Sequence, residues 1–374
     1  MTQPSRGLRK HRVACFISPH GFGHAARSAS VMEALFKMET AVHFDIFTTV
    51  PSWFFEDSLS APFTHHRLFT DIGMVQQSPF QEDLEKTVAQ LNDFLPLAPS
   101  LINQLAQRLD ELQCELALCD IAPMAILAAK EAAIPSVLVE NFTWDWIYQG
   151  YADRDKEMGR HIAYLQSVYA LADHHIQTEP VCCHRHADLL TPPVSREPRT
   201  PRETIRKRLR LSLDKEVVLI TMGGIEERYR SIRELTGQPH VTFLIPGGSQ
   251  AVASVDNLVL FPHHSDFYHP DLVHASDAVI GKLGYSTLAE VYHAGVPFGY
   301  IARPCFPESE PLADYVLRRM PAKAVEEQDF LSGRWLSQLK DILSFERVRR
   351  KGPNGSKEIA SYVCALLSDK KAGA

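Results

Sequence analysis

The chain has 374 residues, of which 45% are hydrophobic and 22% are charged, and its formal net charge is −6 at pH 7. This length and balance are typical of a globular protein with two domains, and the lack of a basic face or arm argues against nucleic acid as a partner. No apolar stretch approaches the length of a membrane span and no signal-peptide cleavage pattern follows the basic N-terminus, so we expect no integral membrane segment.

The first predicted elements are a buried strand at 13–18, a tight loop at 19–24 and an amphipathic helix at 25–38. Gly21 and Gly23 allow the loop backbone to approach a ligand, and the start of a helix attracts anions. The loop is not the dinucleotide fingerprint, because no third glycine with an acidic partner follows. It is not a P-loop either, because no Gly-Lys-Ser/Thr sequence closes it. The pattern is compatible with a different phosphate cradle.

His24, at the junction of this loop and helix, is the candidate general base, because imidazole titrates near neutrality. The competing interpretation is a histidine that only caps the helix and hydrogen-bonds the loop. His20 in the same loop is the second candidate. Arg27, three residues after His24, is placed to pair with a diphosphate or with an anionic group of an acceptor.

Alternating strands and helices continue through the first half of the chain. Residues 71–99 are predicted to form a loop and a helix on the rim of a ligand cleft, in the part that varies with the acceptor. The other predicted strands are 42–48, 63–69, 116–119, 136–139 and 175–178, and the other predicted helices are 101–112, 125–133 and 153–172.

Polar residues stand where two of these strands end. Asp120 and Asn141 occupy such positions, and ligands of open α/β sheets gather at the carboxyl ends of the strands. The segment 140–148 contains two tryptophans and a tyrosine around Asp145. These aromatic residues either stack on a sugar ring or form a core cluster that anchors the next helix. Asp145 is the alternative candidate base.

A stretch rich in proline and arginine, 191–201, is predicted to be a semi-stiff linker, after which the pattern restarts. Two runs of strand–helix alternation with a linker between them predict two doubly wound domains with a ligand cleft between them. The second run has predicted helices at 202–210 and 272–276 and predicted strands at 216–222, 241–245, 257–261 and 277–280.

The most informative stretch is Gly281-Lys-Leu-Gly-Tyr-Ser286, where a strand leads through a glycine turn into a helix. Such a turn and helix start form an anion site. Glu290 lies four residues after Ser286, one turn along the same helix face. Phosphate at the turn and ribose hydroxyls at the carboxylate would make a nucleotide-sugar site. The competing interpretation is an ordinary strand–turn–helix unit in which glycine only permits the turn.

This stretch resembles the donor-binding signature of GT-B glycosyltransferases, notably the lipid-II N-acetylglucosaminyltransferase group. A closer likeness is to the glycosyltransferase-like N-terminal half of L-arabinokinase and its stand-alone relatives. Three stretches, spread over most of the chain, carry that likeness: His20-Gly-Phe-Gly-His-Ala-Ala-Arg27, Asn141-Phe-Thr-Trp-Asp-Trp-Ile-Tyr148 and Gly281-Lys-Leu-Gly-Tyr-Ser286. The sugar-kinase domain of L-arabinokinase has no expected counterpart in these 374 residues.

The resemblance implies a GT-B fold, in which two doubly wound Rossmann-like domains face each other across a cleft. We expect an acceptor-side domain at 1–190, a linker at 191–203 and a nucleotide-sugar-binding domain at 204–350. We also expect a C-terminal helix within 351–374 that packs back on the first domain.

The resemblance also implies roles for individual residues. His24 would deprotonate the acceptor, and Glu290 would bind the ribose of the nucleotide. The residues expected to face the diphosphate or its surroundings are Gly21, Gly23, Arg27, Gly223, Gly224, Gly284, Ser286 and Thr287.

Two positions depart from the pattern of the family. Many members have an Asp/Glu-Gln pair that binds hydroxyls of the donor sugar, whereas this chain has Glu308 and Glu310 and no glutamine there. Glu310 is the best match. Lys282 stands where relatives often have a small residue, and it either pairs with phosphate or is solvated. Both departures leave the identity of the donor open.

The expected function is therefore sugar transfer from a nucleotide-diphosphate sugar, UDP-sugar first, to a small-molecule or lipid-linked acceptor, with inversion and without a metal or other cofactor. The alternatives are a nucleotide-sugar epimerase or hydrolase on the same fold, and a non-catalytic nucleotide-sugar-binding protein. Seven scattered cysteines predict no disulfide framework and a cytoplasmic protein. The cluster Cys182-Cys183-His184-x-His186 lacks the ligand spacing of a zinc site, so no metal is expected.

Overall fold

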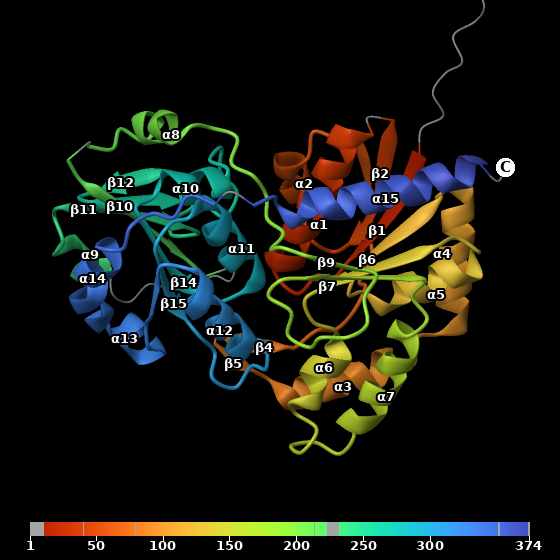
Figure 1. Ribbon diagram of the computed structural model, residues 1–374. Coiled ribbons are helices and arrows are strands. Elements are labelled where there is room, and N and C mark those ends of the chain that lie inside the picture. Colours follow the sequence, from red (N-terminus) through yellow and green to blue (C-terminus); the bar gives the residue numbers. More distant parts are fainter. Residues whose placement is uncertain are drawn as a thin grey trace, which may run out of the picture.

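The computed structural model describes residues 11–39, 41–78, 80–212, 214–222, 232–350 and 352–372 of the chain. Within these residues there are two domains, each built on a seven-stranded sheet, and Figure 1 shows them side by side. The prediction of two doubly wound α/β domains is confirmed. Gly223 and Gly224 lie outside the described residues, so the structure does not place this predicted part of the phosphate site.

The N-terminal sheet is parallel throughout the described strands, in the order β3-β2-β1-β6-β7-β8-β9. The order reverses between β1 and β6, so the carboxyl ends of these two strands border the crevice in which ligands of such sheets bind. The strands are β1 (His11–Ile17), β2 (Val42–Thr48), β3 (Phe63–Arg67), β6 (Leu116–Asp120), β7 (Ser136–Glu140), β8 (His174–Thr178) and β9 (Leu189–Thr191).

Helices cover both faces of this sheet. They are α1 (Phe22–Met38), α2 (Ser52–Ser58), α3 (Leu84–Phe94), α4 (Pro99–Glu111), α5 (Pro123–Glu131), α6 (Trp144–Gln149), α7 (Met158–Tyr169) and the C-terminal α15 (Gly355–Ala372). In β1, Val13 and Cys15 pack into a core with residues of α1, α2 and α15. Ala14 and Phe16 pack into a second core on the opposite face. Because successive side chains are buried on opposite faces, the strand is a continuous apolar run.

The C-terminal sheet has the order β12-β13-β11-β10-β14-β15-β16 and reverses between β10 and β14. Among its described strands only β12 is antiparallel to its neighbour. The strands are β10 (Glu216–Thr221), β11 (Val241–Pro246), β12 (Ala253–Val255), β13 (Leu258–Phe261), β14 (Ala278–Lys282), β15 (Phe298–Ile301) and β16 (Ala322–Ala324). The helices are α8 (Arg202–Arg208), α9 (Ile232–Thr236), α10 (His269–Ala275), α11 (Tyr285–Ala294), α12 (Ser309–Arg319), α13 (Glu327–Ser332), η1 (Arg334–Gln338) and α14 (Leu339–Leu343).

The two segments that cross between the domains are bound to each other. Asn354, on the returning segment, donates from Nδ2 to the carbonyl oxygen of Ser195 at 2.6 Å, and its Oδ1 accepts from the Ser195 amide at 3.3 Å. The amide of Gly355 donates to the carbonyl oxygen of Pro193 at 3.2 Å. Helix α15 then lies along α1 of the N-terminal domain (Figure 1). The two crossings therefore act as one connection between the domains.

Two local differences from the sequence prediction affect the site. Helix α1 begins at Phe22 rather than near residue 25, so His24 lies in its first turn and not in the preceding loop. The region 71–99 contains the predicted helix as α3, but it also contains a short hairpin that was not predicted, β4 (Gln76–Ser78) and β5 (Gln81–Glu82). This hairpin brings polar side chains to the mouth of the cleft.

Candidate functional site

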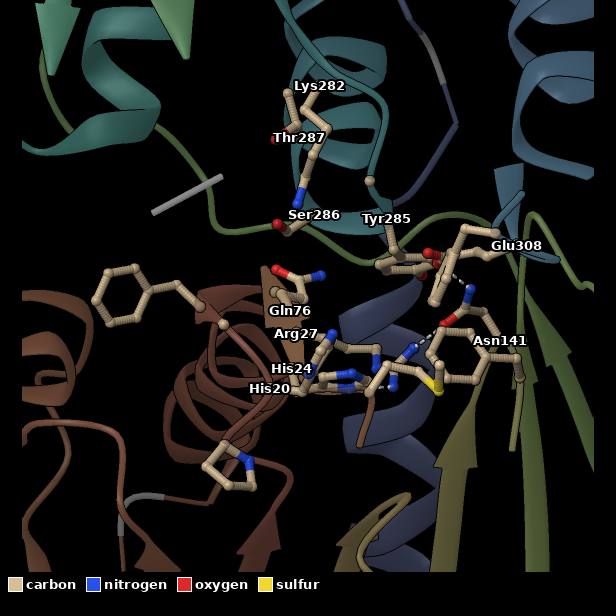
Figure 2. Close-up of a pocket in the computed structure, with 18 of the residues that line it drawn as sticks. His20, His24, Arg27, Gln76, Asn141, Lys282, Tyr285, Ser286, Thr287 and Glu308 are labelled. Atoms are coloured by element: carbon tan, nitrogen blue, oxygen red, sulfur yellow. Dashed lines mark hydrogen bonds between the residues drawn. The ribbon is translucent and has the colours of Figure 1, made fainter. Parts of the chain in front are cut away.

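A cavity of about 360 Å³ lies between the domains, at the carboxyl ends of the strands of both sheets. We call it the larger cavity. Figure 2 shows His20 and His24 on one side of it and Lys282 and Ser286 on the other. The first pair follows β1. In the second pair, Lys282 ends β14 and Ser286 follows it, and each of these strands borders the point where its sheet reverses its order. The fold therefore brings together two motifs that lie about 260 residues apart in the sequence.

His24 is held by Asp120. Its Nδ1 lies 2.7 Å from Asp120 Oδ1, because β1 and β6 pair in parallel with Ile17 opposite Asp120, and α1 starts just after β1. Nη2 of Arg27 lies 3.2 Å from the same nitrogen, but the carboxylate is closer and can only accept. Nδ1 of His24 therefore donates to Asp120, and Nε2 keeps its lone pair. A histidine oriented in this way is suited to act as a general base.

Arg27 is engaged with Asp120 rather than free for a ligand. Its Nε lies 2.9 Å from Oδ2 and its Nη2 lies 2.6 Å from Oδ1 of that carboxylate, a bidentate pair with both side chains buried. Burial alone disfavours the charge on Asp120, but Arg27 and His24 outweigh it and lower the pKa of Asp120 to about 2. Arg27 thus positions Asp120, and its predicted contact with a diphosphate stays a prediction.

A chain of hydrogen bonds continues from Arg27 across the cleft. Nη1 of Arg27 donates to Asn141 Oδ1 at 2.6 Å, and Nδ2 of Asn141 donates to Glu308 Oε1 at 3.1 Å (Figure 2). Asn141 follows β7 of the N-terminal domain, and Glu308 precedes α12 of the C-terminal domain. Both side chains are buried. This contact joins the two walls of the larger cavity next to the His24–Asp120 pair.

Two helix N-termini face the site. Gly21 caps α1 with a φ of 73°. Gly23 lies close to α11, because a Cβ at Gly23 would be 3.5 Å from the hydroxyl oxygen of Ser286. Gly284 caps α11 without a side-chain hydrogen bond, so the first amides of this helix are free for a ligand. A Cβ at Gly284 would have no heavy atom within 4 Å. The predicted glycine residues, except Gly223 and Gly224, are thus found at a place suited to an anion.

A smaller cavity of about 120 Å³ adjoins the first, and Ser286 and Thr287 line both. Glu290 lies in its wall, buried between Arg196 and His269. Its Oε1 lies 2.9 Å from Nη2 of Arg196, and its Oε2 lies 2.8 Å from Nδ1 of His269. Burial raises the pKa of Glu290, but Arg196 and His269 outweigh it and the net pKa is lowered. The carboxylate is thus charged and held in one orientation, with the aromatic side chains of the N-terminal domain opposite it.

Three predicted features line neither cavity. Asp145 is fully buried and pairs with Arg185 at 2.8 Å, so it is not placed to act as a base. Trp144 is a core residue, 1% exposed, whose ring packs against Tyr148 and against the rings of His20 and His24. Glu310 is exposed on the outer side of α12, whereas Glu308, two residues earlier, lines the larger cavity. The structure thus places Glu308 rather than Glu310 at the larger cavity, because a helix start separates their directions, and the role given to Glu310 stays a prediction.

Lys282 and Arg303 bring positive charge into the larger cavity. Burial and, after it, the nearby guanidinium of Arg303 outweigh the effect of Glu308 and Glu82, and the net pKa of Lys282 is lowered to about 7. Sequence reasoning named Lys282 but missed Arg303 and the role of Asp120 as the partner of His24. The sequence showed that Asp120 stands at the end of a strand, but it did not show that His24 is its neighbour in the folded chain.

Within the described part of the chain, no group of three or more His, Cys, Asp or Glu side chains is arranged to hold a metal ion. The same part contains no helix that is both long and apolar enough to cross a membrane.

Comparison with known proteins shows one curated relative. The chain is 29% identical to L-arabinokinase from Arabidopsis thaliana over 388 aligned positions, which cover 98% of this chain and 36% of that protein. The chain thus spans about a third of the length of the curated relative it matches. The predicted likeness to L-arabinokinase is confirmed. No family model matches the chain.

Solved structures share the arrangement of the whole chain. A UDP-glucosyltransferase from Polygonum tinctorium has a TM-score of 0.62 at 14% identity, covering 96% of this chain and 99% of that one. MurG from Acinetobacter baumannii has a TM-score of 0.55 at 14% identity, with 95% and 99% covered. A putative UDP-N-acetylglucosamine 2-epimerase from Listeria monocytogenes has a TM-score of 0.52 at 14% identity, with 98% of each covered. At these identities the likeness shows the fold, and the fold is GT-B.

Proposed function

We propose that the chain is a glycosyltransferase that uses a nucleotide-diphosphate sugar. The observation that carries the proposal is the placement of His24, oriented by Asp120, across the larger cavity from the uncapped N-terminus of α11. A general base and an anion site on opposite walls of one cavity are what the transfer of a sugar from a diphosphate to a hydroxyl requires.

The two adjoining cavities support a binding mode for the donor. The nucleoside would lie in the smaller cavity, where the charged Glu290 accepts hydrogen bonds from the ribose hydroxyls. The diphosphate would lie at Ser286 and Thr287, because these residues line both cavities and belong to the first turn of α11. The sugar would then extend into the larger cavity. UDP is the expected nucleotide, which fits the UDP-dependent proteins of the same fold.

In the proposed reaction the acceptor hydroxyl gives its proton to Nε2 of His24. Its oxygen forms a bond to the anomeric carbon while the bond from that carbon to the diphosphate oxygen breaks, and the diphosphate leaves with the electron pair. Because the base and the diphosphate site are on opposite walls, attack and departure are on opposite faces of the sugar and the configuration inverts. The amides of α11 would stabilise the leaving charge, so the proposed step is metal-independent.

A second candidate is a nucleotide-sugar epimerase or hydrolase on the same fold, favoured by the likeness to the putative 2-epimerase. Such an enzyme would convert or hydrolyse the nucleotide sugar without any acceptor, whereas a transferase would release nucleotide rapidly only when an acceptor is added. A non-catalytic binding protein would do neither. Product analysis by chromatography with and without an acceptor library separates the three.

The first experiment is a thermal-shift screen of the purified chain against UDP, GDP, dTDP and ADP and their sugars. A ligand that binds the folded state at 100 times its Kd stabilises it by about 2.7 kcal/mol, which raises the melting temperature by several degrees. We expect one nucleotide class to give this shift, and the shift to be lost in Glu290→Gln and kept in Glu131→Gln, an exposed glutamate at the end of α5. A chain whose melting temperature responds to none of the nucleotides does not have the proposed function.

A further inference from the structure

Arg303 is a buried cation that the proposed reaction does not use. Its side chain is 4% exposed, lies over the ring of Phe306 at 3.5 Å and borders the larger cavity. The only ion pair of Arg303 in the described part of the chain is a contact of 3.3 Å between its Nη1 and Oε1 of Glu82, on the β5 strand of the opposite domain. Its Nε is buried without any hydrogen-bond partner. A buried guanidinium with an unused donor is costly unless a ligand completes its contacts.

A second cation stands on the neighbouring strand. Lys282 ends β14, which pairs in parallel with β15 so that Lys282 is opposite Ile301, two residues before Arg303. Figure 2 shows the Lys282 side chain directed into the cavity. No ion pair joins its ammonium to a carboxylate of the described residues; Glu308 and Glu82 act on it only at longer range. Burial lowers the pKa of both cations, and the guanidinium of Arg303 lowers that of Lys282 further.

The acidic residues nearby are already committed. Glu82 pairs with Arg303, and Glu308 accepts the hydrogen bond from Asn141 that joins the two walls. A neutral sugar in this cavity would leave the Nε of Arg303 without a charged acceptor and the ammonium of Lys282 without a counter-charge. A carboxylate or phosphate would accept charge-assisted hydrogen bonds from both.

We propose that Lys282 and Arg303 form an anion subsite in the larger cavity, which binds a carboxylate or phosphate group of the substrate other than the diphosphate of the nucleotide. This inference rests on the proposed function and narrows its substrate class. The subsite is separate from the diphosphate site, because Arg303 does not line the smaller cavity and follows β15 rather than the turn before α11. The anionic group belongs either to the transferred sugar, as in a uronic acid, or to the acceptor.

The test is calorimetric titration with ligand pairs that differ only in charge. UDP-glucose and UDP-glucuronate test the donor sugar. Glucose, glucuronate and glucose 6-phosphate, each in the presence of saturating UDP, test the acceptor. If the nucleotide screen selects another base, the same sugars are used on that base. In the unmodified chain we expect the anionic member of one set to bind at least tenfold more tightly than its neutral counterpart.

Three variants make the result specific. Lys282→Met and Arg303→Gln should each remove most of this preference, whereas Lys323→Met, which removes a partly exposed lysine paired with Asp341, should leave it unchanged. Lys282→Met nearly preserves side-chain volume. If Arg303→Gln does not fold, the ligand preference of Lys282→Met alone tests the anion subsite. Equal binding of the neutral and anionic members in the unmodified chain, or a preference that survives both substitutions, overturns the subsite while nucleotide binding still supports the proposed function. Failure to bind any nucleotide overturns both.

Discussion

At the scale of single residues, the site depends on one carboxylate with several partners. Asp120 accepts from His24, from Arg27 through two nitrogens and from the hydroxyl of Ser28 at 2.9 Å. These contacts fix which nitrogen of His24 carries the proton and keep Asp120 charged although it is buried. The chemistry assigned to the histidine therefore depends on a residue 96 positions away in the sequence.

Replacing His24 tests its role as the base. We expect His24→Gln to lower kcat by about 10² to 10⁴-fold, the usual contribution of a general base, while the Kd for the nucleotide changes less than threefold. The measurement is steady-state kinetics with the identified donor and acceptor, together with titration of the nucleotide. His184→Gln, at an exposed histidine, is the control. Turnover that is unchanged in His24→Gln would remove this residue from the mechanism.

The depressed pKa of Asp120 makes a prediction about acid stability. Its pKa is lowered from 3.8 to about 2 in the folded chain. The charged form is thus favoured by folding, and this stabilisation of about 2 kcal/mol is present above pH 4 and is lost as the pH falls towards 2. In Asp120→Asn the buried Arg27 loses its partner, so we expect a variant less stable by about 3 kcal/mol or more at pH 6.

Urea unfolding of both chains from pH 6 to pH 3 measures this difference. The gap in the free energy of unfolding between the original chain and Asp120→Asn should narrow as the pH falls. A gap that stays constant over this range would show that Asp120 is not held in its charged form by Arg27 and His24.

At the scale of elements, two glycines near the junction of β14 and α11 have different structural roles. Gly281 lies inside β14 opposite Thr221 of β10, and a Cβ there would overlap the carbonyl oxygen of Thr221. Gly284 caps α11 with extended backbone, a φ of −150°, and open space where a Cβ would be. The first glycine serves the packing of strands, and the second leaves room at the helix N-terminus.

The two substitutions to alanine should therefore differ in effect: one should lower the stability of the fold, and the other should weaken nucleotide binding. Gly281→Ala should destabilise the chain by about 2 kcal/mol or more, because the overlap is with backbone that cannot move away easily. Gly284→Ala should change the free energy of unfolding by less than about 1 kcal/mol but weaken nucleotide binding at least tenfold, since its methyl group would occupy the phosphate position. Chemical denaturation and calorimetric titration of both variants measure these effects. Normal nucleotide binding by a folded Gly284→Ala would place the diphosphate elsewhere.

Elements of this kind could be predicted because their signals are local. The apolar run of β1, the glycine turns and the linker 191–201 each specify their own conformation, and the strand–helix alternation around them predicted the two doubly wound domains. The start of α1 was three residues too late because Gly21, not His24, caps the helix. The hairpin β4–β5 was missed because its strands are too short and polar to have a periodic pattern.

Partners across space could not be predicted in the same way. Glu290 could be placed on the face of α11 that follows Ser286, but nothing near it in the sequence points to Arg196, which lies 94 positions earlier in the linker. Glu308 and Glu310 are chemically identical in sequence, and only the direction of the chain at the start of α12 places one in the cavity and the other outside. Arg303 was passed over because its burial and its unused donor are properties of the folded state.

At the scale of the whole molecule, the domains are joined by two chain crossings that bind each other through Asn354. The side chain of Asn354 is 5% exposed and makes hydrogen bonds to both backbone groups of Ser195. Further contacts, such as the hydrogen bond from Tyr151 to the carbonyl oxygen of Cys305 at 3.1 Å, join the domains beside the larger cavity.

Removing the Asn354 side chain should loosen this connection. We expect Asn354→Ala to lower the free energy of unfolding by about 2 kcal/mol, because the backbone groups of Ser195 lose a buried partner. Cleavage of the segment 191–201 in limited proteolysis should become faster at the same time. Asn103→Ala, at an exposed position of α4, is the control and should change neither. Equal proteolysis of the two variants would mean that the crossings are held together by other contacts.

Two crossings that are fastened together have a mechanical consequence. Because both crossings meet at Asn354 and Ser195, they give the two domains one common pivot. We predict that the width of the entrance for substrates changes by movement about this pivot. A pair of fluorescent labels, one on each domain, would record that movement during turnover, and loosening the contact in Asn354→Ala would broaden the recorded distances.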